Sequence, residues 1–126
     1  MARTVISGTV TGSVLNLDST LTNVTQSIGT LPQADQTTKD ELQKLVVDLF
    51  EQLKKVPPQN KEVADAIAVQ TEDVVEKAQQ EKPNKTLLQT AVGGLKTMAD
   101  TLQTVAPSVV SLVTSIAGII GKLFGF

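Results

Sequence analysis

The residues of this sequence best suited to acid–base chemistry are three carboxylate pairs. They are Asp40-Glu41, Glu62 with Asp65, and Glu72-Asp73. The sequence has no His and no Cys, which most often supply the general base, the metal ligand or the thiol nucleophile. Each pair has lysines nearby at spacings that favour ion pairs on one helix, namely Lys39, Lys44, Lys61 and Lys77. We therefore expect solvated helix faces, with no catalytic residue, no metal site and no cofactor.

Composition also argues against nucleic acid and nucleotides as ligands. The net charge is −2, the basic residues are dispersed, and Trp and Tyr are absent, so no stacking platform is available for bases. The glycines at 8, 12, 93 and 94 are not followed by the Gly-Lys-Thr of a phosphate-binding loop. Met1 to Thr4 do not open a secretory signal, so the expected location is cytoplasmic.

The first 17 residues have the pattern of a β-strand. The segment contains the β-branched residues Val5, Ile6, Val10 and Val14. Ile6, Val10 and Val14, with Gly8 and Gly12 between them, lie two apart and would share one face of an extended chain over 3–17. Such a strand leaves backbone groups unpaired, and no second strand is evident. It therefore folds back on itself, pairs with another molecule or is a mobile tail. We expect pairing between subunits, so deleting residues 1–17 should lower the oligomeric state.

The remainder, 18–126, is predicted to be one helical domain. A short helix over 19–28 follows from the spacing of Leu21, Val24 and Ile28, although one heptad seam from Val10 to Leu31 is an alternative. Helices over about 38–55 and 60–81 are amphipathic and end at prolines, which predicts an antiparallel hairpin. Helices over 84–106 and 107–124 are predicted to form one long apolar helix, kinked or broken at Pro107.

The C-terminal helix is the most informative element. No charged residue lies between Asp100 and Lys122, about the 20-residue length of a membrane-crossing helix. Its wide apolar face consists of Val109, Leu112, Val113, Ile116, Ile119, Ile120, Leu123 and Phe124. Its narrow face for close packing contains Ser111, Ser115, Gly118 and Gly121. Three explanations remain open: the core helix of a small bundle, burial in an oligomer, or insertion into lipid.

The order of segments resembles a known kind of protein. Asn16 to Gln26, then a helical hairpin closed by Glu81-Lys82-Pro83-Asn84-Lys85, and the ending Leu123-Phe124-Gly125-Phe126 are similar to small non-catalytic helical modules of bacterial, often cyanobacterial, multidomain proteins. Other parts of those proteins are caspase-like, TIR or NTPase effector domains. The resemblance implies assembly or delivery of an effector response in bacterial stress or defence signalling, and a larger effector protein as a partner.

The sequence thus predicts a mainly α fold with an N-terminal β-strand, a short helix, a helical hairpin and a long apolar C-terminal helix. The expected function is non-catalytic self-assembly into a homo-oligomer. The alternative is a membrane-active effector whose C-terminal helix inserts into the inner membrane on activation and forms a pore or lesion, with membrane lipid as the partner.

Overall fold

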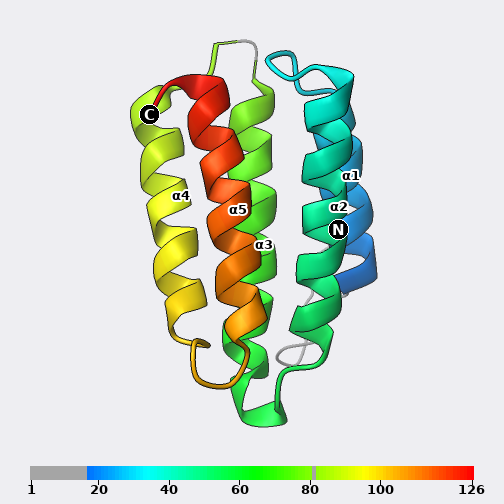
Figure 1. The fold of residues 1–126 in the computed structure, drawn as a ribbon, viewed down its shortest axis with the longest axis vertical. Coiled ribbons are helices and arrows are strands. Elements are labelled where there is room, and N and C mark those ends of the chain that lie inside the picture. Colours follow the sequence, from blue (N-terminus) through cyan, green and yellow to red (C-terminus); the bar gives the residue numbers. More distant parts are fainter. Residues whose placement is uncertain (1–16, 81) are drawn as a thin grey trace, which may run out of the picture.

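The computed structural model describes residues 17–80 and 82–126, and these form a bundle of five α-helices. The helices are α1 (Leu17–Gly29), α2 (Gln36–Lys54), α3 (Lys61–Gln79), α4 (Lys85–Asp100) and α5 (Pro107–Phe124), with a short 3-10 helix, η1 (Pro58–Asn60), before α3. Successive helices alternate in direction (Figure 1).

The predicted fold class is wrong, because the described residues form helices joined by loops and contain no strand. Leu17, which we assigned to the end of the strand, instead begins α1. The other strand residues, Val5, Ile6, Val10 and Val14 among them, lie outside the described residues.

The long C-terminal helix is also corrected. α4 ends at Asp100, the chain turns over 101–106, and α5 runs back beside α4 (Figure 1). Ala106 adopts φ −148° and ψ 68°, outside the helical region that a residue before proline avoids. Pro107 then occupies the first turn of α5, where its missing N–H costs nothing. The buried Leu102 anchors the turn between the two helices.

Capping residues explain where two helices begin. The Asp35 side chain accepts a hydrogen bond from the Thr38 N–H at 2.8 Å and starts α2. The Asn84 side chain accepts one from the Leu87 N–H at 3.0 Å and starts α4. Each cap satisfies a backbone donor that the helix itself leaves free.

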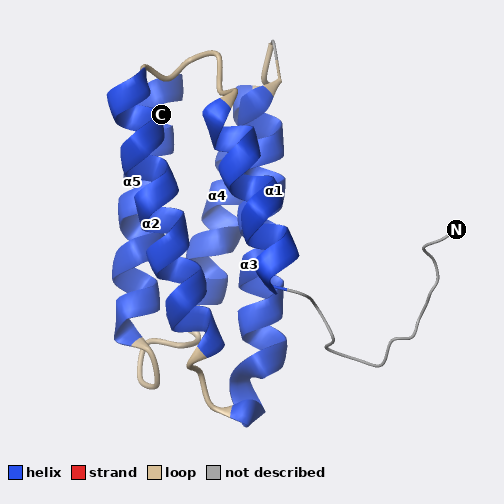
Figure 2. Ribbon diagram, turned by 90° about the vertical axis from the view of Figure 1, so that its right-hand side faces the viewer, coloured by secondary structure: helices blue, strands red, loops and turns tan. Residues whose placement is uncertain are grey.

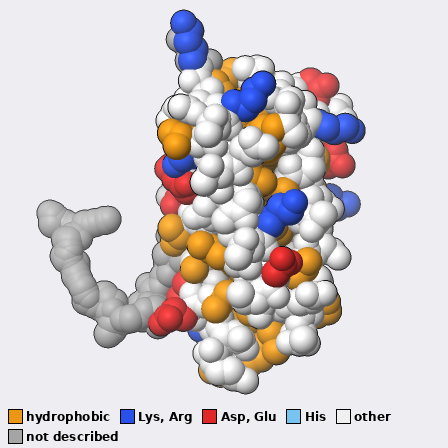
Figure 3. Space-filling view, turned by 90° about the vertical axis from the view of Figure 1, so that its left-hand side faces the viewer, with side chains coloured by type: hydrophobic (Ala, Val, Ile, Leu, Met, Phe, Trp, Pro, Cys, Tyr) orange, Lys and Arg blue, Asp and Glu red, His pale blue; other side chains and the backbone are white. Residues whose placement is uncertain are grey.

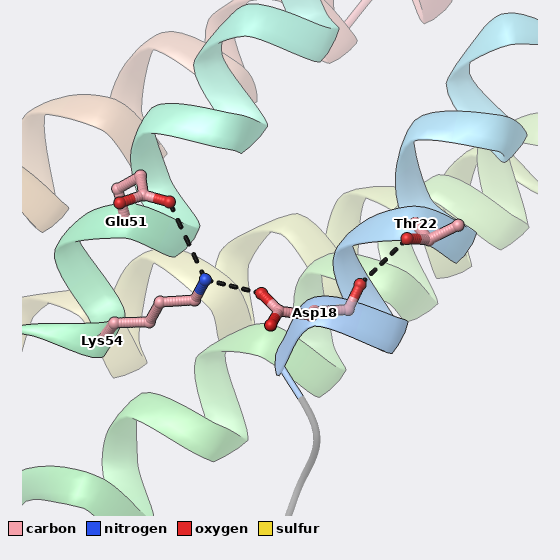
Figure 4. Close-up of polar contacts among 4 residues, drawn as sticks. All are labelled: Asp18, Thr22, Glu51 and Lys54. Carbon is pink, nitrogen blue, oxygen red and sulfur yellow. Dashed lines mark hydrogen bonds and ion pairs between the residues drawn. The ribbon is translucent and has the colours of Figure 1, made fainter.

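Helix α1 packs against both α2 and α3, so the predicted hairpin of α2 and α3 shares its inner side with a third helix. α1 is rich in Thr and Asn, which are weak helix formers, and depends on this packing. Gln43 of α2 donates to the Thr25 carbonyl at 2.9 Å. Lys54, drawn in Figure 4 between Glu51 and Asp18, joins the start of α1 to the end of α2 at 2.6 Å.

The hydrophobic core runs the length of the bundle and receives side chains from every helix. Its largest fully buried members are Phe50, Ile28, Leu31, Leu42, Leu49, Leu53, Ile67, Leu88, Leu95, Leu102, Ile116 and Ile120. Helices α2 and α4 both contact α5, so the apolar side of α5 forms part of the hydrophobic core.

Candidate interaction surface on helices α4 and α5

The wide apolar face of α5 lies against the bundle of its own chain. Val109, Val113, Ile116, Ile120 and Phe124 are buried. The flanking residues Leu112, Ile119 and Leu123 are half-buried and pack on the same core. Ser108 at the start of α5 donates to the Gln52 carboxamide oxygen of α2 at 3.0 Å and fixes this side of the helix. Most of the apolar area of α5 is thus covered within one copy of the chain.

The small-residue face of α5 points outward instead. Ser111, Ser115 and Gly118 are exposed, whereas Gly121 is buried beneath the C-terminal turn. Gly125 adopts φ 79°, and both Gly125 and Phe126 donate backbone hydrogen bonds to the Gly121 carbonyl. A Cβ on Gly121 would lie 2.8 Å from the Phe126 carbonyl oxygen, so this glycine serves the helix end.

A groove of about 460 Å³ runs between α4 and α5 on the outer surface. It is lined by Gln89, Val92, Gly93, Lys96, Thr114, Ala117, Gly118, Gly121 and Phe126. Figure 3 shows the side of the molecule on which α4 lies, where separate lysine side chains stand out from a surface that is mostly white and orange.

Two glycines of this groove have no role in the packing of the described residues. A Cβ built on Gly93 or on Gly118 would meet no atom of the described residues within 4 Å. A glycine within a helix destabilises it by about 1 kcal/mol relative to alanine. The fold alone therefore gives no reason for glycine at either position.

Charge is divided between the two sides of the bundle. α4 and α5 carry three lysines (Lys85, Lys96 and Lys122) and one carboxylate, Asp100. α1 and α3 carry six carboxylates (Asp18, Glu62, Asp65, Glu72, Asp73 and Glu76) and two lysines. Figure 2 places α1 and α3 on the opposite side of the bundle from α5, while α4 packs against α3. The excess of lysine on α4 and α5 and the excess of carboxylate on α1 and α3 therefore belong to different helices of one bundle.

The carboxylate pairs do not converge on a common centre. Asp40, Glu41 and Glu62 are exposed, and Asp73 forms an ion pair with Lys77 at 2.8 Å on α3. Among the described residues, no three His, Cys, Asp or Glu side chains lie close enough together to hold a metal ion.

Asp65 differs from the other carboxylates. Its Oδ2 is buried and has no hydrogen-bond partner among the described residues. Burial raises the pKa of this carboxyl, and the charge of Lys61 partly opposes the rise.

Comparison with protein-family models, with curated proteins and with solved structures finds no match to this chain. Function is therefore inferred from the α4–α5 surface itself.

Proposed function

We propose that this chain is a non-catalytic module that assembles with copies of itself through the outer surface of α4 and α5. The observation that carries the proposal is the α4–α5 groove, with Gly93 and Gly118 at positions where the fold does not need glycine. A helix backbone without a Cβ lets another surface approach closely, so a contact with a second molecule gives these glycines a reason.

The contrast with α2 supports the same surface. The exposed positions of α2 include Asp40, Lys44, Asp48, Glu51 and Lys54, a charged face typical of a helix in water. The exposed positions of α5 before Lys122 are Pro107, Ser108, Ser111, Thr114, Ser115 and Gly118. Charged residues are depleted at the centre of protein interfaces, and this helix shows that depletion.

Burial of the apolar face of α5 alters the expected mechanism of self-assembly. That face is already inside the bundle, so copies would meet through preformed surfaces rather than by gathering their C-terminal helices into a common core. Assembly of this kind is compatible with bacterial stress or defence signalling and with a larger effector protein as a partner.

The test is the solution mass as a function of concentration, by sedimentation or light scattering. We expect the mass to rise above the 13.3 kDa of one chain as the concentration increases. A mass that stays at 13.3 kDa up to millimolar concentration would remove the proposal.

Membrane activity is the second candidate, because α5 is long and apolar enough to span a membrane, although a core helix passes the same test. Insertion would require α5 to leave the bundle. The sequence has no Cys, so a bifunctional thiol reagent can cross-link Gln52→Cys of α2 to Ser108→Cys of α5, positions whose native side chains meet at 3.0 Å. We expect vesicle dye release from the protein before cross-linking and none after it. Equal release in both states, or none in either, would reject this mechanism.

A further inference from the structure

The outer side of α3 has an exposed valine between two carboxylates. Glu62, Val69 and Glu76 are seven residues apart, so they lie on one line along α3, with about 10 Å between neighbours. Glu62 and Glu76 are exposed, and Val69 is 49% exposed, the second largest value among the large hydrophobic side chains described. We call these three residues the α3 ridge.

The α4–α5 groove has the opposite distribution of charge. Gly93 and Gly118 provide its open floor, and Lys96 lines it one turn from Gly93. Lys122 lies one helical turn beyond Gly118, on the other side of the floor along the groove. The groove thus has an uncharged floor at Gly93 and Gly118, with the ammonium groups of Lys96 and Lys122 on either side of it. The α3 ridge has Val69 at its centre, with a carboxylate on either side.

We infer that the α4–α5 groove binds the α3 ridge of a second copy of this chain, with Val69 over Gly93 and Gly118 and the two glutamates near the lysines. This inference rests on the proposed self-assembly and specifies its geometry. A helix packs in a groove between two others when small residues allow close approach of the backbones.

Charge excludes two other contacts between copies. A twofold contact of the α4–α5 groove with itself would bring the lysines of both copies together, and like charges across an interface are unfavourable. The exposed face of α2 carries lysines among its carboxylates, and Lys54 is already paired with Asp18 and Glu51. Among the described helices, α3 combines apolar and acidic exposed positions without a lysine, because its exposed residues are Glu62, Val69 and Glu76.

The groove and the ridge are separate surfaces of one chain. A copy that binds a second copy through its groove therefore still has a free ridge, and the reverse also holds. Such a heterologous contact repeats from copy to copy and gives a ring or an open filament. It also gives a sharp test, because each half of the contact can be blocked separately.

The experiment uses Gly118→Trp to fill the groove and Val69→Arg to disrupt the ridge. Both positions are exposed, and circular dichroism checks that each variant folds. Each variant alone should self-associate at least about tenfold more weakly than the unmodified chain, a change of about 1.4 kcal/mol. An equimolar mixture should form a one-to-one dimer and nothing larger, since one open groove and one open ridge remain. Val47→Arg, at a valine 38% exposed on α2, is the matched control and should assemble normally.

The possible failures are distinct. If the unmodified chain stays at 13.3 kDa, the proposed function fails and this inference fails with it. If the unmodified chain assembles but either variant assembles equally well, or the mixture contains no dimer, the groove-and-ridge contact is wrong while self-assembly stands. Loss of assembly in Val47→Arg would also overturn the assignment to α3.

Discussion

Gly93, Gly118 and Gly121 have different roles in this chain, and alanine substitutions can distinguish these roles. Gly118→Ala and Gly93→Ala should each stabilise the bundle by about 1 kcal/mol, because alanine is the better helix former and its Cβ meets no described atom. Thermal unfolding of dilute protein measures the effect in one copy. A loss of stability at either position would show that the fold does need the glycine.

Gly121 is the contrasting position. Gly121→Ala should lower the melting temperature, because its Cβ would lie 2.8 Å from the Phe126 carbonyl oxygen and would force the C-terminal turn open. The same thermal scan compares it directly with Gly118→Ala, three residues earlier on the same helix. A melting temperature equal to or above that of the parent would contradict the role given to Gly121.

Asp65 predicts a pH dependence with a definite sign. Burial raises the pKa of this carboxyl in the folded chain, so the folded state binds its proton more tightly than the unfolded state. Its contribution to stability is present below the unfolded pKa and is lost as pH rises through the folded pKa. Asp65→Asn should therefore be more stable than the parent at pH 7, and the difference should shrink on acidification towards pH ~4, the usual range of a free Asp.

Denaturant titrations of both proteins at several pH values measure this difference in the free energy of unfolding. Asp35 acts in the opposite direction, since its hydrogen bonds with Thr38 lower its pKa and its contribution is lost as pH falls. Because Asp35 is present in both proteins, it cancels in the comparison. A difference that grows on acidification would contradict the account of Asp65.

At the level of elements, the cap of α4 gives a prediction. Asn84→Ala should cost about 1 kcal/mol, since the Leu87 N–H loses its acceptor at the exposed start of the helix. Asn84→Asp is the matched control, because aspartate caps equally well. Chemical denaturation measures the free energy of unfolding of both variants. An equal decrease in both would show that the loss of stability does not come from the missing cap.

The sequence predicts some elements better than others, for physical reasons. Prolines at 57, 58 and 83 and the cap Asn84 act locally, so the ends of α2 and α3 and the start of α4 follow from neighbouring residues. The break after Asp100 could not be located this way, because Leu102 and Val105 continue the apolar spacing of α4. Leu102 is fully buried in the hydrophobic core at the turn, which periodicity does not show. The groove escaped prediction for the same reason, since its two walls come from different helices.

For the whole molecule, the separation of charge predicts salt-dependent assembly. A contact between the α3 ridge and the α4–α5 groove joins carboxylates to lysines near the protein surface. Dissolved salt screens the attraction between such charges, with a screening length of about 10 Å at 0.1 M. Raising the salt concentration should therefore weaken association, as measured by sedimentation at fixed protein concentration. Association that strengthens with salt would indicate an apolar contact in which these charges have no part.

The alternating course of the helices has a consequence for anything joined to this chain. The chain ends at one pole of the bundle, whereas α1 begins well away from that pole, as Figure 2 shows for the start of α1 and the C-terminus. Partners fused before Leu17 and after Phe126 would be separated along the bundle by about the 20 Å that the 13 residues of α1 span. The bundle would then act as a rigid spacer between them rather than as a hinge that brings them together.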